Sequence, residues 1–428
     1  MSFLVTKSSP PVLVVPSEPT PAGNIPLASA DKSRLCLSFT SLHVFDIPIH
    51  EPAETVRRAL SSALVHYYPI AGRLAVNAGV DSSDVQLACT GDGVAFVAAA
   101  ACCTLEEARF LHAPLAIPLA DLALRYGGRC QMPDPLLMAQ VTEFGCGGYV
   151  LAVTWNHAVT DGFGIAQFLQ AVGELARGVS PPSVVPVRYD GSLPEIPQLY
   201  AALGPYLKGR AHVDFAYTDV TIPWSFINRV KAEFSQQQQG GGQRSCSTFE
   251  VVTAAIWQCR TRAIRTADPG SPAPLVFTVN VRNHVGAKDG YYGNCVTSQL
   301  VMAESGAVAG GDVVEVVKLV RGGKEWIAAT IKAGEAQVVL DEELIGALCG
   351  YGALILSSWG DIGLDAVDLG GGTPARVMAN MEMTILPSCL TCLPCTSKCG
   401  GGDGVNVIAF CVSEEHADGF HAELARLR

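Results

Sequence analysis

Charged residues are scarce in this sequence. They make up 16% of its 428 residues, against roughly 25% in an average globular protein, while hydrophobic residues make up 49%. The net charge is −11, and no long basic run occurs. Because proteins that bind nucleic acids carry basic surfaces, these values argue against a nucleic-acid partner. They indicate a core-rich globular chain, long enough for two or three domains.

A hydrophobic segment long enough to cross a membrane is also missing. The longest apolar run, 344–359, is interrupted by Gly346, Gly350 and Gly352, and a span needs about 20 apolar residues. Lys7 and several prolines break the N-terminal segment, which therefore does not resemble a signal peptide. The fifteen cysteines are an odd number scattered through apolar segments. We expect reduced thiols, a cytoplasmic location and no membrane partner.

Several common catalytic signatures are absent. The sequence has no G-x-S-x-G elbow, no G-x-x-x-x-G-K-[ST] loop, no H-E-x-x-H pair and no G-x-G-x-x-G opening a helix. An enzyme of this sequence therefore needs no obvious nucleotide-binding loop or metal motif. We expect no tightly bound cofactor and no metal site.

One cysteine run challenges that expectation. Cys389, Cys392, Cys395 and Cys399 have the x2, x2, x3 spacing of a bacterial iron–sulfur motif. The proline that ends this motif is replaced by Gly400, and no second run exists to hold a second cluster. Four thiolates could also bind zinc. An iron–sulfur or zinc protein remains an alternative, and a cysteine-rich loop is the simpler interpretation.

Hydrophobic periodicity predicts a mixture of helices and strands. A proline-rich stretch, 179–212, separates two halves and predicts an ordered crossover. The expected helices are 51–69, 165–176 and 247–264, and the last begins with Ser247 or Thr248 as its N-cap. The expected strands are 149–155, 276–282, 381–387 and 405–411. The cysteine run would then lie in a hairpin loop between the last two strands.

The segment HAVTD, His157–Asp161, is the strongest catalytic candidate. It lies where an apolar strand ends and a helix begins, and Gly162 and Gly164 follow it. Glycines there permit a tight turn and the close approach of a ligand. A neutral imidazole could act as a general base on an attacking alcohol or amine. The competing interpretation is a structural histidine.

Several stretches together resemble the plant BAHD acyl-CoA-dependent acyltransferases. They occur in the family's order and cover essentially the whole chain. They are YYPIAGRL (67–74), NHAVTDG (156–162), STFEVVTAAIWQCRTRA (247–263), NVRN (280–283), YYGN (291–294) and DLGGGTP (368–374).

This resemblance implies a fold and a division into domains. The fold would be α/β with mixed sheets, built as two chloramphenicol-acetyltransferase-like domains with a channel between them. The N-terminal domain would comprise residues 1–190 and carry HAVTDG. A crossover linker would comprise 191–212, and the C-terminal domain would comprise 213–428 and carry DLGGG.

The resemblance also implies roles for individual residues. His157 would be the general base. Asp161 would turn away from the chemistry and pair with Arg282, with Gly162 supporting the site. A fixed guanidinium suits such a pairing because it binds a carboxylate through two hydrogen bonds. Asp368 would be mainly structural, although a catalytic role is also assigned to it. Candidate contacts for the phosphate-bearing co-substrate are Ser247, Thr248 and Arg260.

Leu369 and Gly371 depart from the family's D-F-G-W-G motif, and the change keeps an amine acceptor open. The expected activity is acyl transfer from a CoA thioester, with hydroxycinnamoyl or benzoyl favoured. The acceptor would be a small alcohol, phenol or amine, and the enzyme a monomer. The competing hypothesis from this departure is a degenerate member that binds ligands without catalysis.

Overall fold

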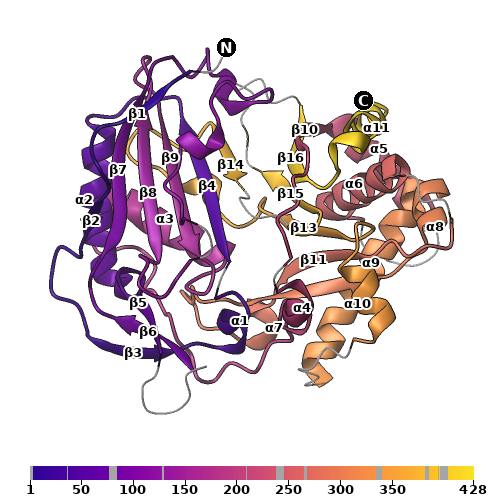
Figure 1. Ribbon diagram of the computed structural model, residues 1–428, viewed down its shortest axis with the longest axis horizontal. Helices are drawn as coiled ribbons and strands as arrows, with labels where there is room; N and C mark the ends of the chain where they lie inside the picture. The colour runs from indigo at the N-terminus through magenta and orange to yellow at the C-terminus, as the bar shows by residue number, and fades with distance from the viewer. Residues whose placement is uncertain are drawn as a thin grey trace. The chain divides into compact units, whose positions relative to one another are not determined.

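The computed structural model describes residues 3–35, 37–76, 84–127, 130–208, 210–237, 245–264, 268–333, 340–380, 385–393, 395 and 403–428. Its contacts divide the chain into two compact units (Figure 1). The N-terminal unit comprises Met1–Glu195, Val285–Cys295 and Asp361–Asn380. The C-terminal unit comprises Ile196–His284, Val296–Gly360 and Met381–Arg428.

Two late segments thus belong to the N-terminal unit. The sequence-based division into 1–190, 191–212 and 213–428 places both of them in the C-terminal domain. The three sequence-based domain boundaries stay a prediction. The crossover region contains a helix, α4 (Leu199–Leu207).

The N-terminal unit contains a seven-stranded sheet and a smaller three-stranded sheet. The large sheet runs in the order β1-β7-β8-β9-β4-β14, and β2 also pairs with β7. Its strands are β1 (Val5–Lys7), β2 (Val12–Val14), β4 (Ser38–Phe45), β7 (Val94–Ala101), β8 (Leu137–Glu143), β9 (Tyr149–Asn156) and β14 (Arg376–Asn380). The small sheet contains β3 (Gly23–Pro26), β5 (Arg73–Val76) and β6 (Val85–Cys89).

Strand β9 carries the candidate histidine at its end. Every residue of its sequence YVLAVTWN is buried, because antiparallel neighbours β4 and β8 flank it and both faces are covered. Helices α2 (Pro52–His66) and α3 (Gly162–Ala176) pack against each other, and α2 also contacts β7 and β8 (Figure 1). The predictions of this strand and of both helices are confirmed.

The C-terminal unit contains a six-stranded sheet in the order β10-β16-β15-β13-β11-β12. The pairs β11–β13 and β13–β15 are parallel and the other pairs are antiparallel. The strands are β10 (Tyr217–Pro223), β11 (Leu275–Asn280), β12 (Val296–Val301), β13 (Leu354–Ser358), β15 (Ser388–Leu393) and β16 (Gly404–Phe410). The predicted strands at 276–282 and 405–411 are therefore confirmed.

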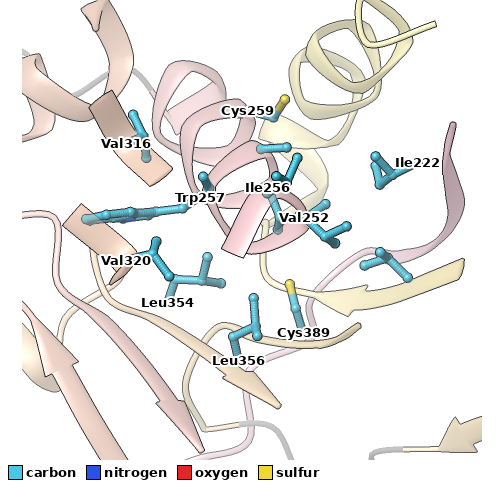
Figure 2. Packing of buried hydrophobic residues seen from close by; sticks show 14 of the residues in the cluster. Ile222, Val252, Ile256, Trp257, Cys259, Val316, Val320, Leu354, Leu356 and Cys389 are labelled. Carbon is cyan, nitrogen blue, oxygen red and sulfur yellow. The ribbon is translucent and has the colours of Figure 1, made fainter. Parts of the chain in front are cut away.

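Helix α6 (Thr248–Ile264) fills the centre of this unit. Figure 2 shows its Ile256 and Trp257 packed in the cluster that contains Leu354 and Leu356 of β13. These side chains are fully buried, and each such burial contributes about 1.5–3 kcal/mol. The predicted helix is confirmed. Further helices of the unit are α5 (Trp224–Gln237), α8 (Ser305–Gly310), α9 (Val313–Ala333), α10 (Glu342–Leu348) and α11 (Glu414–Ala425).

One sequence-based expectation near the C-terminus is wrong. Cys389 and Cys392 lie within β15, which pairs with β16, and not in a hairpin loop. The predicted strand 381–387 lies mostly outside the described residues, and its described part, residues 385–387, is not in a strand.

No helix within the described ranges is both long enough and apolar enough to cross a membrane.

Candidate active site

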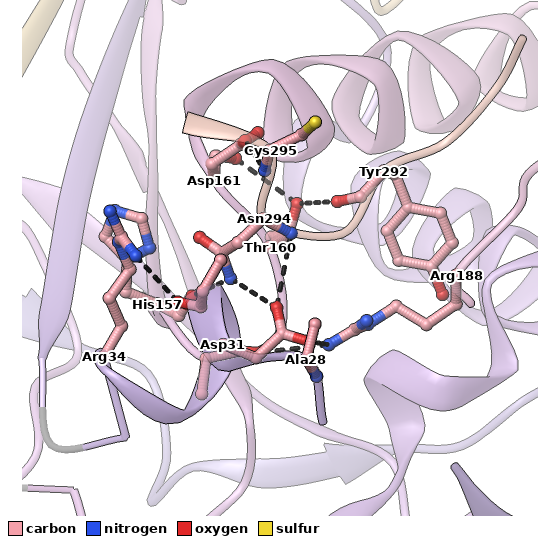
Figure 3. A network of polar contacts seen from close by, with 12 residues as sticks. Ala28, Asp31, Arg34, His157, Thr160, Asp161, Arg188, Tyr292, Asn294 and Cys295 are labelled. Carbon is pink, nitrogen blue, oxygen red and sulfur yellow. Dashed lines mark hydrogen bonds and ion pairs between the residues drawn. The ribbon is translucent and has the colours of Figure 1, made fainter. Parts of the chain in front are cut away.

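The candidate histidine lies at the first residue after β9. Its backbone N–H donates to the Leu37 carbonyl at 2.8 Å, and its carbonyl accepts from Asn294 Nδ2 at 2.7 Å. The next N–H, of Ala158, donates to Asn156 Oδ1 at 2.8 Å. The strand-to-helix turn expected from the sequence is present. A backbone carbonyl accepts from the His157 N–H, and the side chains of Asn156 and Asn294 bind the peptide group that follows His157. Figure 3 shows the Asn294 side chain beside this turn.

The His157 ring has an aromatic neighbour and lies within reach of the Arg34 charge. Phe39 contacts it edge to face, with the ring centroids 5.1 Å apart. Burial, together with the positive charge of Arg34, lowers the pKa of His157 to about 4. Its Nδ1 atom is buried and has no hydrogen-bond partner among the described residues. The imidazole is therefore neutral near pH 7 and can accept a proton.

The Asp161 carboxylate accepts hydrogen bonds from backbone N–H groups. It is 1% exposed and is the N-cap of α3. Its Oδ1 accepts from Gly164 N at 3.0 Å and its Oδ2 accepts from Cys295 N at 2.9 Å. Both bonds satisfy buried donors, so the carboxylate stabilises the turn. The structure supports the expected structural role, and the pairing with Arg282 stays a prediction.

Packing restricts the two glycines after Asp161 to different degrees. A Cβ on Gly164 would lie 2.0 Å from the Tyr292 carbonyl oxygen and 2.0 Å from Thr160 Oγ1. A Cβ on Gly162 would meet only Ile362 Cδ1, at 3.3 Å. The close approach of the 291–295 segment thus requires glycine at position 164 more than at position 162.

Three polar residues around the turn were not predicted. Asp31, Arg188 and Asn294 form a buried network with the carbonyls of His157 and Ala158 (Figure 3). Asn294 belongs to the YYGN stretch, and the resemblance of that stretch to the family was the only sequence signal that pointed to Asn294. For Asp31 and Arg188, no local pattern in the sequence marked a role.

Asp368 organises its own turn. Its Oδ1 accepts from Gly370 N at 2.8 Å and from Gly372 N at 2.9 Å. Its Oδ2 lies 3.5 Å from Arg177, whose guanidinium also donates to the Asp368 carbonyl. Both carboxylate oxygens are engaged, which supports a structural role over a catalytic one.

Two of the three candidate CoA contacts lie at the start of α6. Ser247 Oγ accepts from Glu250 N at 3.2 Å, and Ser247 N donates to Glu250 Oε2 at 2.8 Å, which forms a capping box. Thr248 Oγ1 accepts from Lys231 Nζ at 2.9 Å. Of the two residues predicted as possible N-caps of this helix, Ser247 is therefore the one that caps it.

Arg260 lies in the interior of the C-terminal unit. It is fully buried, and its guanidinium donates to the carbonyls of Cys411, Gly352 and Tyr351. Its donors are used by the fold, so the geometry does not favour a phosphate contact. Arg282 begins the short helix α7 (Arg282–Val285) and donates to Asn280 Oδ1 from its backbone N at 3.1 Å.

The cysteine run does not present its thiols in a common loop. Cys389 is 2% exposed and lies in the core cluster of the C-terminal unit (Figure 2). Burial raises the pKa of its thiol, which opposes the thiolate form that metals require. Cys399 lies outside the described residues. Among the residues described, no group of three or more histidines, cysteines or carboxylates could hold a metal ion.

The comparison with protein families identifies the family of this chain. The model of the Transferase family matches residues 4–426. The chain belongs to this family, the BAHD acyltransferases. It is an acyltransferase, and the resemblance inferred from the six sequence stretches is confirmed.

Two plant relatives align along the whole chain. Acyl transferase 15 of Oryza sativa subsp. japonica is 41% identical, covering 100% of this chain and 99% of the relative. Myricetin 3-O-glucosyl 1,2-rhamnoside 6'-O-caffeoyltransferase AT1 of Crocosmia x crocosmiiflora is 34% identical, covering 99% of each.

Solved structures support the fold. Vinorine synthase matches with a TM-score of 0.70 at 18% identity, covering 99% of this chain and 98% of its own. F. graminearum TRI101, complexed with coenzyme A and T-2 mycotoxin, matches with a TM-score of 0.69 at 15% identity, covering 95% and 99%. The predicted mixed α/β fold of the chloramphenicol-acetyltransferase type is confirmed. The channel expected between the domains stays a prediction.

Proposed function

We propose that this acyltransferase moves an acyl group from a CoA thioester to a hydroxyl or amine of a small specialised metabolite, with His157 as general base. The observation that carries the proposal is the state of His157. Its backbone is fixed on both sides, its pKa is lowered to about 4, and its ring is therefore neutral at working pH.

The proton transfer is confined to one ring nitrogen. Because Nδ1 of His157 is buried, Nε2 is the nitrogen that receives the proton from the acceptor. The acceptor oxygen or nitrogen forms a bond to the thioester carbonyl carbon as Nε2 removes its proton. The tetrahedral intermediate then collapses, the C–S bond breaks, and the imidazolium protonates the leaving thiolate.

The low pKa of His157 has two consequences for these reaction steps. A weak base removes the proton late, once the acceptor has become acidic by bonding to carbon. The imidazolium formed in a buried site is a strong acid, so it returns its proton to the thiolate readily. Much of the acceleration then comes from holding both substrates together in a ternary complex.

The acyl donor is proposed to be hydroxycinnamoyl-CoA or benzoyl-CoA. The name of the Crocosmia relative, a caffeoyltransferase, supports the hydroxycinnamoyl choice. The CoA bound to TRI101 supports a CoA thioester as co-substrate. Ser247 and Thr248 are retained as proposed CoA contacts, whereas Arg260 is set aside because the fold uses its donors. A cytoplasmic, monomeric enzyme completes the proposal.

The test is a substrate screen with a matched control. Purified protein is incubated with p-coumaroyl-CoA, benzoyl-CoA and acetyl-CoA against a pool of alcohols, phenols and amines, and products are identified by mass spectrometry. His157→Ala should abolish product formation while folding survives. His50→Ala should not, because the His50 side chain is 89% exposed and belongs to no part of the site.

The screen also separates the competing hypotheses. Product formation that persists in His157→Ala would overturn the general-base assignment. Binding of CoA thioesters without transfer to any acceptor would favour a degenerate, ligand-binding member. Stoichiometric iron or zinc that disappears when Cys392 and Cys395 are both changed to Ser would favour the metal alternative.

A further inference from the structure

We propose that Asp31 and Arg188 are positioning residues that hold the catalytic histidine through its backbone. This inference rests on the proposed role of His157 as the base. Neither residue touches the imidazole in any contact that the structure shows. Their effect would be to orient the two peptide groups that follow His157.

The ion pair between them is fully enclosed. Asp31 is 0% exposed, the Arg188 side chain is 3% exposed, and Arg188 Nη2 lies 3.0 Å from Asp31 Oδ2. Asp31 Oδ2 also accepts from Ala28 N at 3.0 Å. Its Oδ1 accepts from Asn294 Nδ2 at 2.8 Å and from Asn294 N at 3.3 Å. The carboxylate is thus satisfied from three separate segments of the chain (Figure 3).

Two of these partners reach the catalytic turn. Asn294 Nδ2 donates to the His157 carbonyl at 2.7 Å, and Arg188 Nη2 donates to the Ala158 carbonyl at 3.0 Å. Consecutive carbonyls are therefore held by two donors, and both donors are oriented by the single carboxylate of Asp31. Fixing two successive peptide planes determines the backbone torsion angles at Ala158 and restricts the position of the His157 ring.

Stability alone is a poor explanation for this arrangement. Taking both charges out of water costs several kcal/mol, and a buried ion pair often contributes no net stability relative to apolar residues of similar size. The pair also introduces little net charge, because Asp31 balances Arg188. What it supplies is a rigid set of donors at the carbonyls beside the base. A displacement of about 1 Å at a reacting group can lower the rate about 100-fold.

The chain offers a matched control at Asp190. It is also a buried aspartate of the N-terminal unit, and it accepts from Ser192 and pairs with Lys288 at 3.3 Å. Asp31→Asn and Asp190→Asn therefore each remove one buried carboxylate charge. The cation that loses its partner is Arg188, whose side chain is 3% exposed, in the first case and Lys288, whose side chain is 63% exposed, in the second. Only the first substitution acts on the donors that bind the carbonyls of His157 and Ala158.

The experiment compares both variants in the full-length enzyme with p-coumaroyl-CoA and the acceptor that gives most product in the screen. We expect Asp31→Asn to lower kcat by about 10- to 100-fold with KM for the donor unchanged. The solvent deuterium isotope effect on kcat should rise, because a displaced base makes proton transfer more rate-limiting. Asp190→Asn should keep both kcat and the isotope effect.

Independent readouts keep the proposal falsifiable. Hydrogen exchange by mass spectrometry on the peptide spanning 156–161 needs no substrate, and it should accelerate in Asp31→Asn only. If Asp31→Asn does not fold, Asn294→Ala leaves the Asp31–Arg188 pair intact and should give the same kinetic pattern. Arg188→Lys keeps the charge and should retain more kcat than Arg188→Met.

Each contrary result has a distinct meaning. Folded Asp31→Asn and Asn294→Ala variants with unchanged kcat would overturn this inference and leave the proposed function intact. A rate loss with an unchanged isotope effect would indicate a smaller active fraction and would also overturn it. Activity that persists in His157→Ala, measured in the same series, would overturn the proposed function and this inference together.

Discussion

At the scale of single residues, the environment of His157 determines what its imidazole can do. The side chain has an ordinary pKa of 6.5, and burial with the nearby Arg34 charge lowers it to about 4. Asp161, four residues later, accepts hydrogen bonds from backbone N–H groups with both of its carboxylate oxygens. The two polar residues of this short stretch therefore have separate proposed roles: His157 in the chemistry and Asp161 in the structure of the turn.

The lowered pKa predicts the acid limb of the rate profile. Because the folded-state pKa lies below the unfolded value, His157 stays a free base until the pH approaches 4. We expect the His157-dependent limb of kcat/KM to have its midpoint near pH 4, not near pH 6.5. Between pH 6.5 and 4 the unfolded chain binds the additional proton, so this residue lowers the free energy of unfolding as the pH falls.

The measurement is kcat/KM against pH in parallel with urea unfolding at each pH. His157→Gln should remove this residue's contribution to the pH dependence of unfolding. An acid limb with its midpoint near pH 6.5 in the folded enzyme would contradict the described environment of the ring.

At the scale of elements, the start of α3 links the catalytic turn to a distant segment. Asp161 caps the helix through Gly164 N and binds Cys295 N, while Gly164 leaves room for the Tyr292 carbonyl. Thr160 Oγ1 donates to that carbonyl at 2.6 Å. The helix N-terminus, the turn and the 291–295 segment therefore form one unit of packing.

Two helix caps in the chain allow this link to be measured. Asp161 caps α3 and Asp341 caps α10, where Asp341 Oδ1 accepts from Leu344 N at 2.8 Å. Loss of a cap costs about 0.5–2 kcal/mol, and a buried N–H left without a partner costs about 1–3 kcal/mol more. We therefore expect Asp161→Ala to destabilise the fold clearly more than Asp341→Ala.

Chemical unfolding of the two variants, followed by circular dichroism, gives the comparison. Equal losses of stability would show that the bond from Asp161 to Cys295 N contributes little.

At the scale of the whole molecule, the N-terminal unit is completed by residues from late in the chain. Strand β14 pairs with β4 along the register Val377↔His43. The segment Val285–Cys295 supplies Asn294, which binds the His157 carbonyl. The first 195 residues therefore lack an edge strand and a partner of the catalytic turn.

This composition predicts the behaviour of an N-terminal fragment. Residues 1–195 alone would expose the edge of β4 and leave Asp31 and Asp161 without partners from the 285–295 segment. Because an uncovered sheet edge promotes association, we expect the fragment to aggregate and to lack cooperative unfolding. Size-exclusion chromatography and near-ultraviolet circular dichroism provide the measurement, with the full chain as control. A monomeric fragment that unfolds cooperatively would contradict this expectation.

The sequence predicted the elements whose pattern is local and strong. Strand β9 and helices α2, α3 and α6 carry long apolar runs or a clear helical period, and all were placed correctly. The predicted strand 381–387 lies mostly outside the described residues. The cysteine run was expected in a hairpin loop because it lies between two predicted strands, whereas Cys389 lies in β15 and faces a buried core.

What the sequence determined by itself was the family and the turn that carries His157. The family resemblance depends on six short stretches, each of them local in the sequence. The turn depends on a strand, two glycines and an amphipathic helix that follow one another along the chain. Only the tertiary structure decided which side chains hold that turn. Asp31, Arg188 and Asn294 come from segments up to 263 residues apart. Hydrogen bonds between distant segments leave no periodic trace in the chain, because they depend on how the strands and helices pack.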